Sequence, residues 1–491
     1  MASQSSSPSL SGLPNELLLM ICLWLAAEFD PGVLHFPQIY IPSFEADAAL
    51  QGLCALTRTS KRFSELAKQA LYRNVVLIKP RAHLTLLRSI IYAPHLSKYV
   101  RSMVIANQGV VTRQIGALGG RLQASTVVPT PLCRDVIWRS GQADTQIPVL
   151  DGLPKLGQLW FSAIPLIWGR ITEPLRRHFE DHRDEALAVL SLAYRLPNLR
   201  RLRYMFLPLP PGQWTNEGPN RFHKNFLAAI SLLGELNLDN FGMRLFPKLE
   251  ELDLACILDG DLSRTLDSLV SLNRLSVRLS RYGRYPLELP AHLATSLRDL
   301  HLSLHGTAIP ESFHSLLRSL RNLERLKLVK LPGLTRQDSV DQLVLGLESR
   351  AASLRELCIE IAVTETRFAR PLRVRLRPIN WSRFSALRIL QVPDITVYGT
   401  VDGEFTMSLP PKIECLGIAA LFRGYVSPPA TMMESIEADR ARYPGLTSLE
   451  MSVSATLNPT IQQHLGRDFS ERLAQCGVTL SFHWLPATFD L

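Results

Sequence analysis

The chain has 491 residues, of which 46% are hydrophobic and 20% are charged, so most of it is expected to fold rather than to stay disordered. Its net charge of +10 does not by itself indicate nucleic-acid binding, because the basic residues are dispersed and no run of five or more occurs. The seven cysteines are scattered and include no Cys-x-x-Cys pair. A disulfide framework and a zinc site are therefore not expected, and a reducing compartment fits best.

The chain begins with a Ser-rich stretch, residues 1–9, which has no apolar periodicity and is expected to be a flexible tail. A helix is predicted to start at Pro14, since proline suits a first helical position and Glu16 complements the positive end of the helix dipole. Every residue from 17 to 25 is apolar. A helix packed on one side needs only an apolar stripe, so the second face of this one needs a covering partner.

Two further helices are predicted after an acidic, proline-containing loop. The first resumes at Leu50 and runs through Leu56. The second has Ser60 as its N-cap. Its apolar residues recur at i, i+3, i+4, i+7 and i+8, the spacing of a one-sided helix: Phe63, Leu66, Ala67, Ala70 and Leu71. Residues 10–78 are therefore expected to form a module of three short helices.

The three predicted helices carry one spaced pattern: Leu13-Pro14-x-Glu16-Leu17-Leu18-x-x-Ile21, Leu53-x-x-Leu56, Ser60-Lys61-Arg62-Phe63-x-x-Leu66 and Leu71-Tyr72-Arg73-x-Val75. This pattern resembles an F-box, a helical motif that docks on the Skp adaptor of cullin-based ubiquitin ligases and precedes a substrate-recruiting domain. The loop at residues 26–47 is longer than that family usually has. The adaptor-binding residues that the resemblance implies are Leu13, Pro14, Leu17, Leu18, Ile21, Leu53, Leu56 and Phe63.

The apolar run at residues 17–27 also allows other interpretations. A secretory signal would have a positively charged segment before the run, where this chain has Asn15-Glu16. A membrane span would need about 20 apolar residues. No membrane association is therefore expected, and an intracellular location, cytoplasmic or nuclear or both, is predicted. A plain core helix without a partner remains an open alternative.

A repeating leucine pattern, given in the next paragraph, has a first copy at Val100 and is then interrupted. Residues 79–180 are expected to hold one repeat and an irregular insertion. Glycines and prolines punctuate the insertion, and Trp138, Trp160, Phe161 and Trp168 lie among them. A polar linker would lack these aromatic residues, so the insertion is expected to be partly folded. A helix at residues 182–194 restores the regular pattern.

One phrase, Leu-x-x-Leu-x-(Leu/Val/Ile), recurs with minor variation through residues 181–491. Eight copies start at Leu249, Leu272, Leu297, Leu323, Leu354, Leu387, Ile413 and Leu446. Their spacing of 23 to 33 residues resembles that of leucine-rich repeats, whose unit is a strand and a return helix. Amphipathic return helices are predicted at residues 312–320 and 341–347. Degraded copies are expected at Val100 and Leu199, a last strand at residues 478–482, and the status of a copy at Leu233 stays open.

The predicted fold class is therefore α/β: a three-helix module that resembles an F-box, followed by a leucine-rich-repeat solenoid with a curved parallel sheet and outer helices. The sequence contains no phosphate-binding loop, no Gly-x-Ser-x-Gly elbow and no His-Glu-x-x-His motif. His301 and His305 would lie about 13 Å apart on a strand, too far to share one ion. Asp253, Asp259 and Asp261 form a tight acidic cluster, and Gly260 between two of them indicates a turn rather than a metal site. No metal, cofactor or enzymatic activity is expected.

A binding surface is predicted instead on the concave face of the sheet. The residue between the last two apolar positions of each copy would face solvent there. The predicted substrate-binding residues are Arg203, Asp253, Arg274, Ser276, His301, Lys327, Gln391 and Glu450. Arg274 is included as a neighbour of Ser276, although it does not occupy the same position in its copy. This row mixes both charges, whereas a nucleic-acid groove would carry one sign. A specific protein partner is favoured.

The resemblance thus implies a non-catalytic substrate-recognition subunit that binds a Skp-type adaptor, through it a cullin, and an unidentified protein substrate. Two alternatives remain open: a leucine-rich-repeat scaffold outside any ligase, and a basic nucleic-acid-associated factor. The densest basic patch, Arg367, Arg370, Arg373, Arg375, Arg377 and Arg383, alternates with apolar residues. That alternation is typical of a strand with one solvated face, although a site for an acidic partner is also possible.

Overall fold

The computed structural model describes residues 13–27, 44–77, 86–87, 89–90, 92–106, 192, 195–205, 246–258, 266–267, 269–279, 289–304, 312–331, 337–361, 379–393, 408–420, 436, 440–454 and 470–485. Contacts divide the chain into two compact units. The first comprises Met1–Asp253 and Arg264–Ser271, and the second comprises Leu254–Ser263 and Leu272–Leu491. Each unit is described by itself.

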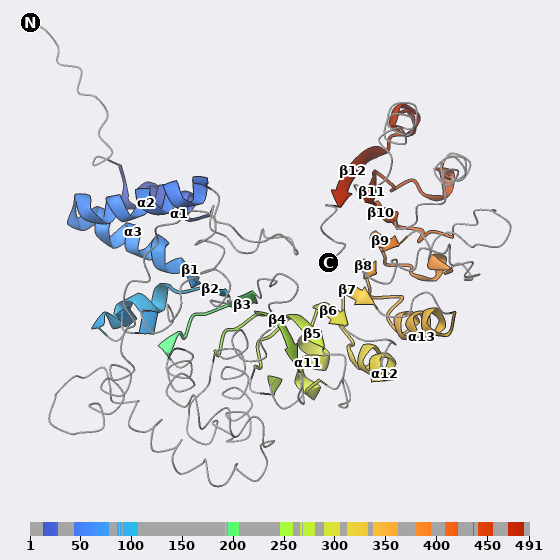
Figure 1. Ribbon diagram of the computed structural model, residues 1–491, viewed down its shortest axis with the longest axis horizontal. Coiled ribbons are helices and arrows are strands. Elements are labelled where there is room, and N and C mark those ends of the chain that lie inside the picture. Colours follow the sequence, from blue (N-terminus) through green and yellow to red (C-terminus); the bar gives the residue numbers. More distant parts are fainter. Residues whose placement is uncertain are drawn as a thin grey trace, which may run out of the picture. The chain divides into compact units, whose positions relative to one another are not determined.

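The first unit begins with the three predicted helices, α1 (Asn15–Ala27), α2 (Phe44–Thr59) and α3 (Lys61–Arg73), which pack together (Figure 1). Helix α2 starts earlier than the predicted Leu50, so the connection before it is shorter than expected. The predicted N-cap of α3 is confirmed, because the Ser60 hydroxyl accepts a hydrogen bond from the Phe63 amide at 3.2 Å. This bond satisfies one of the amides that lack a partner in a helical first turn.

A small apolar core holds the three helices together. Its fully buried members, Cys22, Leu53, Ala67 and Ala70, come from all three helices, and the two alanines let the helices approach closely. Arg62 at the start of α3 fixes the start of α1. Its Nε donates to Asn15 Oδ1 and its Nη2 donates to the Leu13 carbonyl, each at 2.6 Å. Helix α1 is therefore held at its first turn and along one face.

Parallel strands follow the helices in the first unit. β1 (Asn74–Leu77) pairs with β2 (Ser102–Ala106), which pairs with β3 (Arg201–Met205), and a 3-10 helix, η3 (Pro94–Tyr99), precedes β2. The degraded copies predicted at Val100 and Leu199 are thus confirmed as strands. β4 (Glu251–Leu258) begins in this unit.

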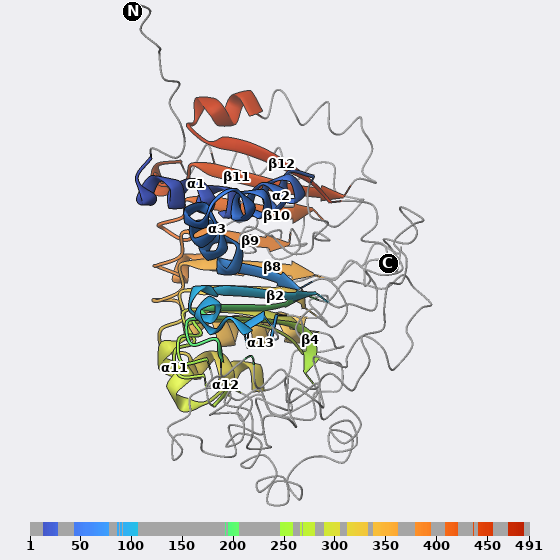
Figure 2. The same ribbon diagram turned by 90° about the vertical axis from the view of Figure 1, so that its left-hand side faces the viewer.

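The remaining seven copies of the phrase, and the last strand predicted at residues 478–482, coincide with strands of the second unit: β5 (Arg274–Leu279), β6 (Asp299–Leu304), β7 (Arg325–Leu331), β8 (Glu356–Ile361), β9 (Ile389–Pro393), β10 (Cys415–Ala420), β11 (Ser448–Ser454) and β12 (Thr479–Leu485). Among the described residues, the sheet has 12 strands in the order β1 to β12, and the described pairs are parallel. β8 to β12 follow one another in Figure 2. The chain is therefore an α/β protein with a parallel sheet in strict sequence order.

The phrase builds this sheet because equivalent residues stack in register. Leu275, Leu300, Leu326 and Leu357 align across β5 to β8, and all are buried. Backbone hydrogen bonds link successive copies at the N-terminal ends of the strands, which we call the strand entrances. The Arg298 carbonyl accepts from the amides of Glu324 and Arg325, both at 2.9 Å. A single copy could not bury its apolar face, so stacking supplies the core.

Polar side chains just before the strands satisfy further backbone carbonyls. The Asn322 amide donates to the Thr295 carbonyl at 2.6 Å, and the Ser296 hydroxyl donates to the Leu272 carbonyl at 2.8 Å. In the first unit Asn198 donates in the same way to the Lys98 carbonyl at 3.0 Å. These bonds fix each copy to the preceding one at a point where regular pairing has not begun.

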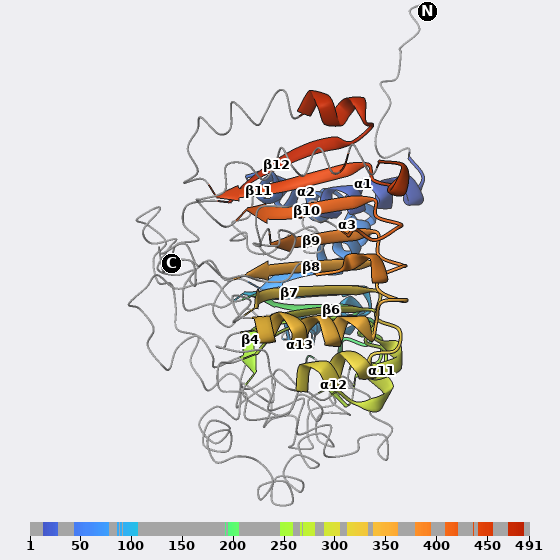
Figure 3. The ribbon, with the colours of Figure 1, turned by 90° about the vertical axis from the view of Figure 1, so that its right-hand side faces the viewer.

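Helices cover one face of the second unit's sheet. α11 (Ala291–Ser296), α12 (Ser312–Ser319) and α13 (Gln337–Glu348) lie on the same side of the strands (Figure 3). The predicted helical faces are confirmed, since Phe313, Leu317, Leu343 and Leu347 are buried. Later return legs include 3-10 turns, η8 (Trp381–Arg383) and η10 (Arg440–Arg442), where the sequence predicted helices throughout. Beside η8, the Trp381 and Phe384 rings pack with centroids 5.5 Å apart and supply the apolar bulk there.

Several predictions lie outside the described residues. These are the flexible tail at residues 1–9, the insertion beyond residue 106, most of the helix at residues 182–194, the copy at Leu233, and the arginines from Arg367 to Arg377. His305, Asp259 and Asp261 are also outside them.

Candidate binding surfaces

Helix α1 exposes large apolar side chains in the described structure. Leu17, Met20, Ile21 and Trp24 are 44%, 63%, 40% and 66% exposed. Their spacing is i, i+3, i+4 and i+7, which places them on one side of the helix. We call these four residues the α1 apolar face.

The opposite side of α1 packs into the chain's own core. Leu18 is 2% exposed and Cys22 is fully buried, and burial raises the pKa of the Cys22 thiol. The expectation that α1 has apolar surface on two sides is therefore confirmed. The core residues fix the position of the helix, and the α1 apolar face remains open to solvent.

The structure separates the predicted adaptor-binding residues into two groups. Leu17, Ile21 and Pro14 are exposed, and Leu13, Leu56 and Phe63 are half-buried. Leu18 and Leu53 differ from the prediction, because they are buried within the helices and cannot touch a partner directly. Met20 and Trp24 were missed, although helical periodicity from Leu17 selects both.

A second candidate surface lies on the sheet, in the residue between the last two apolar positions of each copy. Ser276, His301, Lys327, Cys358, Gln391, Gly417 and Glu450 align in register across β5 to β11. We call these residues the central row. Flanking side chains such as Leu326 and Leu328 are buried on the other face. The predicted common face is confirmed for Ser276, His301, Lys327, Gln391 and Glu450.

In the first unit, the two predicted residues of this type form an ion pair. Arg203 Nε lies 3.2 Å from Asp253 Oδ2, and both side chains are mostly buried. Arg274 does not belong to the central row, because it lies two residues before Ser276 in β5. Its Nε lies 3.3 Å from Asp299 Oδ2, and Arg325 Nε lies 3.2 Å from the same oxygen. Arg274 thus takes part in an arginine–carboxylate–arginine group along the strand entrances.

Side chains of the central row contact one another and their strand neighbours. Ser276 Oγ lies 3.2 Å from His301 Nδ1, and Lys327 Nζ lies 2.5 Å from Glu360 Oε1. Burial alone would lower the pKa of Lys327, but the electrostatic interactions with Cys358 and Glu360 and the hydrogen bond to Glu360 outweigh it and raise that pKa. Burial raises the pKa of the Cys358 thiol to about 12, so this thiol is neutral at physiological pH.

Near its C-terminal end, one side chain of the central row crosses a neighbouring strand. Gln391 on β9 donates through Nε2 to Glu450 Oε2 on β11 at 2.9 Å, although β10 lies between them. The crossing passes over Gly417, where an added Cβ would be only 2.6 Å from Gln391 Cγ. A residue with a side chain at 417 would obstruct this path. Gly417 therefore allows the contact between Gln391 and Glu450.

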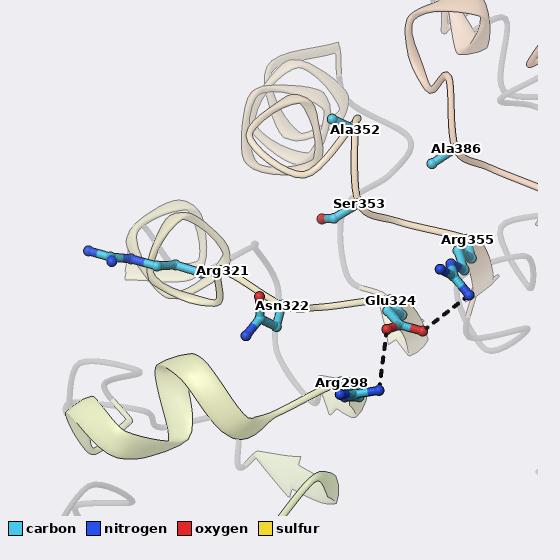
Figure 4. Close-up of a pocket in the computed structure, with 8 residues that line it drawn as sticks. All are labelled: Arg298, Arg321, Asn322, Glu324, Ala352, Ser353, Arg355 and Ala386. Atoms are coloured by element: carbon cyan, nitrogen blue, oxygen red, sulfur yellow. Dashed lines mark ion pairs between the residues drawn. The ribbon is translucent and has the colours of Figure 1, made fainter.

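A third feature is an open hollow of about 350 Å³ at the strand entrances of the second unit (Figure 4). Arg298 and Arg355 each lie 3.7 Å from a Glu324 carboxylate oxygen. Arg321 also lines the hollow, but its side chain extends away from this group. The arginines do not converge on one point, so the hollow provides no concentrated anion site.

The described residues contain no group of three or more His, Cys, Asp or Glu that could hold a metal ion. In the same part of the chain, no helix has both the length and the apolar character needed to cross a bilayer. The chain matches no protein-family model, and a comparison with curated proteins found no significant match. Its function is therefore argued from the α1 apolar face and the central row.

Proposed function

We propose that the chain is the substrate-recognition subunit of a Skp–cullin–F-box ubiquitin ligase. Helices α1 to α3 bind a Skp-type adaptor, and the sheet presents its solvent face to a protein substrate. The chain itself transfers nothing, and the adaptor, the cullin and a conjugating enzyme complete the ligase. The observation that carries this proposal is the α1 apolar face, which lies on a helix fixed by its own core.

The α1 apolar face supports a protein partner because soluble monomers seldom expose adjacent large apolar side chains without a use. Burying each such side chain contributes roughly 1.5–3 kcal/mol. Arg62 and the buried residues Leu18 and Cys22 hold α1 in place before any partner binds. Little order must then be gained on binding, which favours affinity.

The same face argues against a simple scaffold role. If α1 to α3 only capped the end of the repeats, their outer surface should be polar, because terminal caps keep solenoids soluble. Trp24 and Met20 are instead the two most exposed residues of the α1 apolar face. The nucleic-acid alternative is not favoured either, since Arg203 and Asp253 pair and the central row ends in Glu450.

The proposal is tested by co-expression of the full-length chain with a Skp-type adaptor. Leu17→Glu combined with Trp24→Ser places a charge and a small polar group on the α1 apolar face. Loss of two large apolar contacts should weaken adaptor binding by a few kcal/mol, roughly a hundredfold or more. The circular dichroism of the chain should be unchanged, because neither residue belongs to the core.

The matched control is Leu345→Glu on α13. Leu345 is 49% exposed, close to the 44% of Leu17, so it undergoes the same chemical change at similar exposure. This variant should bind the adaptor like the unmodified chain. If the Leu17 and Trp24 double variant still retains stoichiometric adaptor, the docking assignment is wrong.

A further inference from the structure

In the second unit, the Lys and Arg residues of the strands are confined to the first three strands of its sheet. Strands β5 to β7 contain five Lys and Arg residues: Arg274, Arg278, Arg325, Lys327 and Lys330. Strands β8 to β12 contain no Lys or Arg, and their acidic residues are Glu356, Glu360 and Glu450. In a chain with a net charge of +10, a run of five strands without a basic residue is unusual.

The acidic residues of β8 lie on the solvent face of the sheet. Glu356, Cys358 and Glu360 alternate with the buried Leu357 and Ile359, and successive strand residues point to opposite faces. Glu360 contacts Lys327 and Cys358, which confirms its position beside the central row. Among the described residues, Glu356 has no ion-pair partner. Within the described strands, the solvent face of β8 to β12 therefore carries carboxylates but no lysine or arginine.

Glu450 is a fixed acceptor on this face. Gln391 holds its Oε2 across Gly417, and its neighbours in register are small. These neighbours are Gly417 on β10 and Ser481 on β12. Burial, with the nearby Glu450 charge, raises the pKa of Cys415 to about 11, so this thiol is neutral and is a hydrogen-bond partner of the Glu450 carboxylate. Among the described residues, Glu450 has an amide partner but no ion-pair partner.

We propose that the solvent face of β8 to β12 binds an extended basic segment of a partner protein, with Glu450 receiving a Lys or Arg side chain. Gln391 covers Gly417 on one side of Glu450, and the small Ser481 on β12 leaves room for a long side chain to approach from the other side. The additional carboxylate of Glu356 attracts further basic residues of the same segment. A nucleic acid does not fit this face, because carboxylates repel phosphates.

This inference rests on the proposed function in one respect: it identifies the chemistry of the substrate that the sheet presents for modification. It also gives Gln391 and Gly417 positioning roles. Gln391 holds one oxygen of Glu450 and orients the carboxylate, while Gly417 keeps the path of Gln391 open. Gly417→Ala should displace Gln391, because the new Cβ would be 2.6 Å from its Cγ.

The test measures fluorescence polarisation of a labelled nine-residue peptide of alternating Arg and Ala, titrated with the full-length chain. A peptide with Gln at every Arg position is the uncharged control. Glu450→Gln should raise the Kd for the Arg peptide at least tenfold, which corresponds to about 1.4 kcal/mol or more. Glu356→Gln should weaken binding severalfold, and Gly417→Ala should do the same without removing a charge.

The matched control is Glu414→Gln, which removes the same charge just before β10. Glu414 is exposed and pairs with Arg388 at 3.2 Å, outside the central row. It should leave the peptide Kd unchanged. Equal weakening by Glu414→Gln and Glu450→Gln would show a general charge effect and overturn the proposal. Equal binding of the Gln peptide would overturn it as well, as would self-association of the chain that Glu450→Gln abolishes.

Adaptor binding is measured on the same preparations. Loss of peptide binding in Glu450→Gln with full adaptor capture supports the proposed basic-segment site. If the unmodified chain captures no adaptor but still distinguishes the two peptides, the ligase proposal fails and the basic-segment site stands. If adaptor capture succeeds and the two peptides bind alike, only the basic-segment site fails.

Discussion

Leu326 and Lys327 are adjacent in β7 but face opposite sides of the sheet, so alanine substitutions at these two positions test the assigned orientation. Leu326 is 2% exposed and aligns with Leu300 and Leu357. Truncating a buried leucine removes its apolar contacts and leaves a cavity, which costs about 2–5 kcal/mol. Lys327 and Glu360 are both partly exposed, so loss of their ion pair should cost about 1 kcal/mol or less.

Urea unfolding of the full-length chain, followed by far-ultraviolet circular dichroism, compares the two variants. A domain has a total stability of about 5–15 kcal/mol, so Leu326→Ala should remove a large fraction of it and lower the unfolding midpoint clearly. Lys327→Ala should leave the midpoint nearly unchanged. Similar losses in both variants would refute the assignment of inward and outward positions, and with it the central row.

Three further predictions concern Ser60 and Cys358. Ser60→Ala should lower the free energy of unfolding by about 1 kcal/mol in a thermal or urea melt, because the Phe63 amide loses its acceptor; an unchanged melt would contradict the cap. The pKa of Cys358, raised to about 12, leaves a thiolate fraction of about one in ten thousand at pH 8. Iodoacetamide at that pH should therefore alkylate exposed Cys54 long before Cys358, which peptide mapping would show. The neutral Cys358 thiol also stabilises the fold below the ordinary thiol pKa, and stability should fall as pH rises from about 9 toward 12.

The repeated phrase predicted the strands well because its signal is regular. Each copy carries leucines at fixed spacing, and a parallel sheet in sequence order is the arrangement that stacks them. The central row followed from the same spacing, since strand residues alternate between faces. The 3-10 turns near Trp381 and Arg440 were not predicted. Two aromatic rings or a short turn can replace a return helix, and such a segment shows no helical periodicity in the sequence.

The spacing of apolar residues did not predict which residues of α1 are exposed, or which side chains of the central row touch. A continuous apolar run conceals which residues of α1 face the core, so Leu18 was grouped with Leu17 and the exposed Trp24 was missed. The contact between Gln391 and Glu450 joins residues 59 positions apart and depends on the absence of a side chain at Gly417. Only the register of three strands brings these residues together.

Affinity purification of the full-length chain from cells, with quantitative mass spectrometry of the associated proteins, tests whether the chain belongs to a ubiquitin ligase. We expect a Skp-type adaptor and a cullin to be recovered at near-stoichiometric amounts with the unmodified chain and with Leu345→Glu. Both should be lost from the variant that combines Leu17→Glu with Trp24→Ser. Recovery of neither protein with the unmodified chain would contradict the assignment to a ubiquitin ligase.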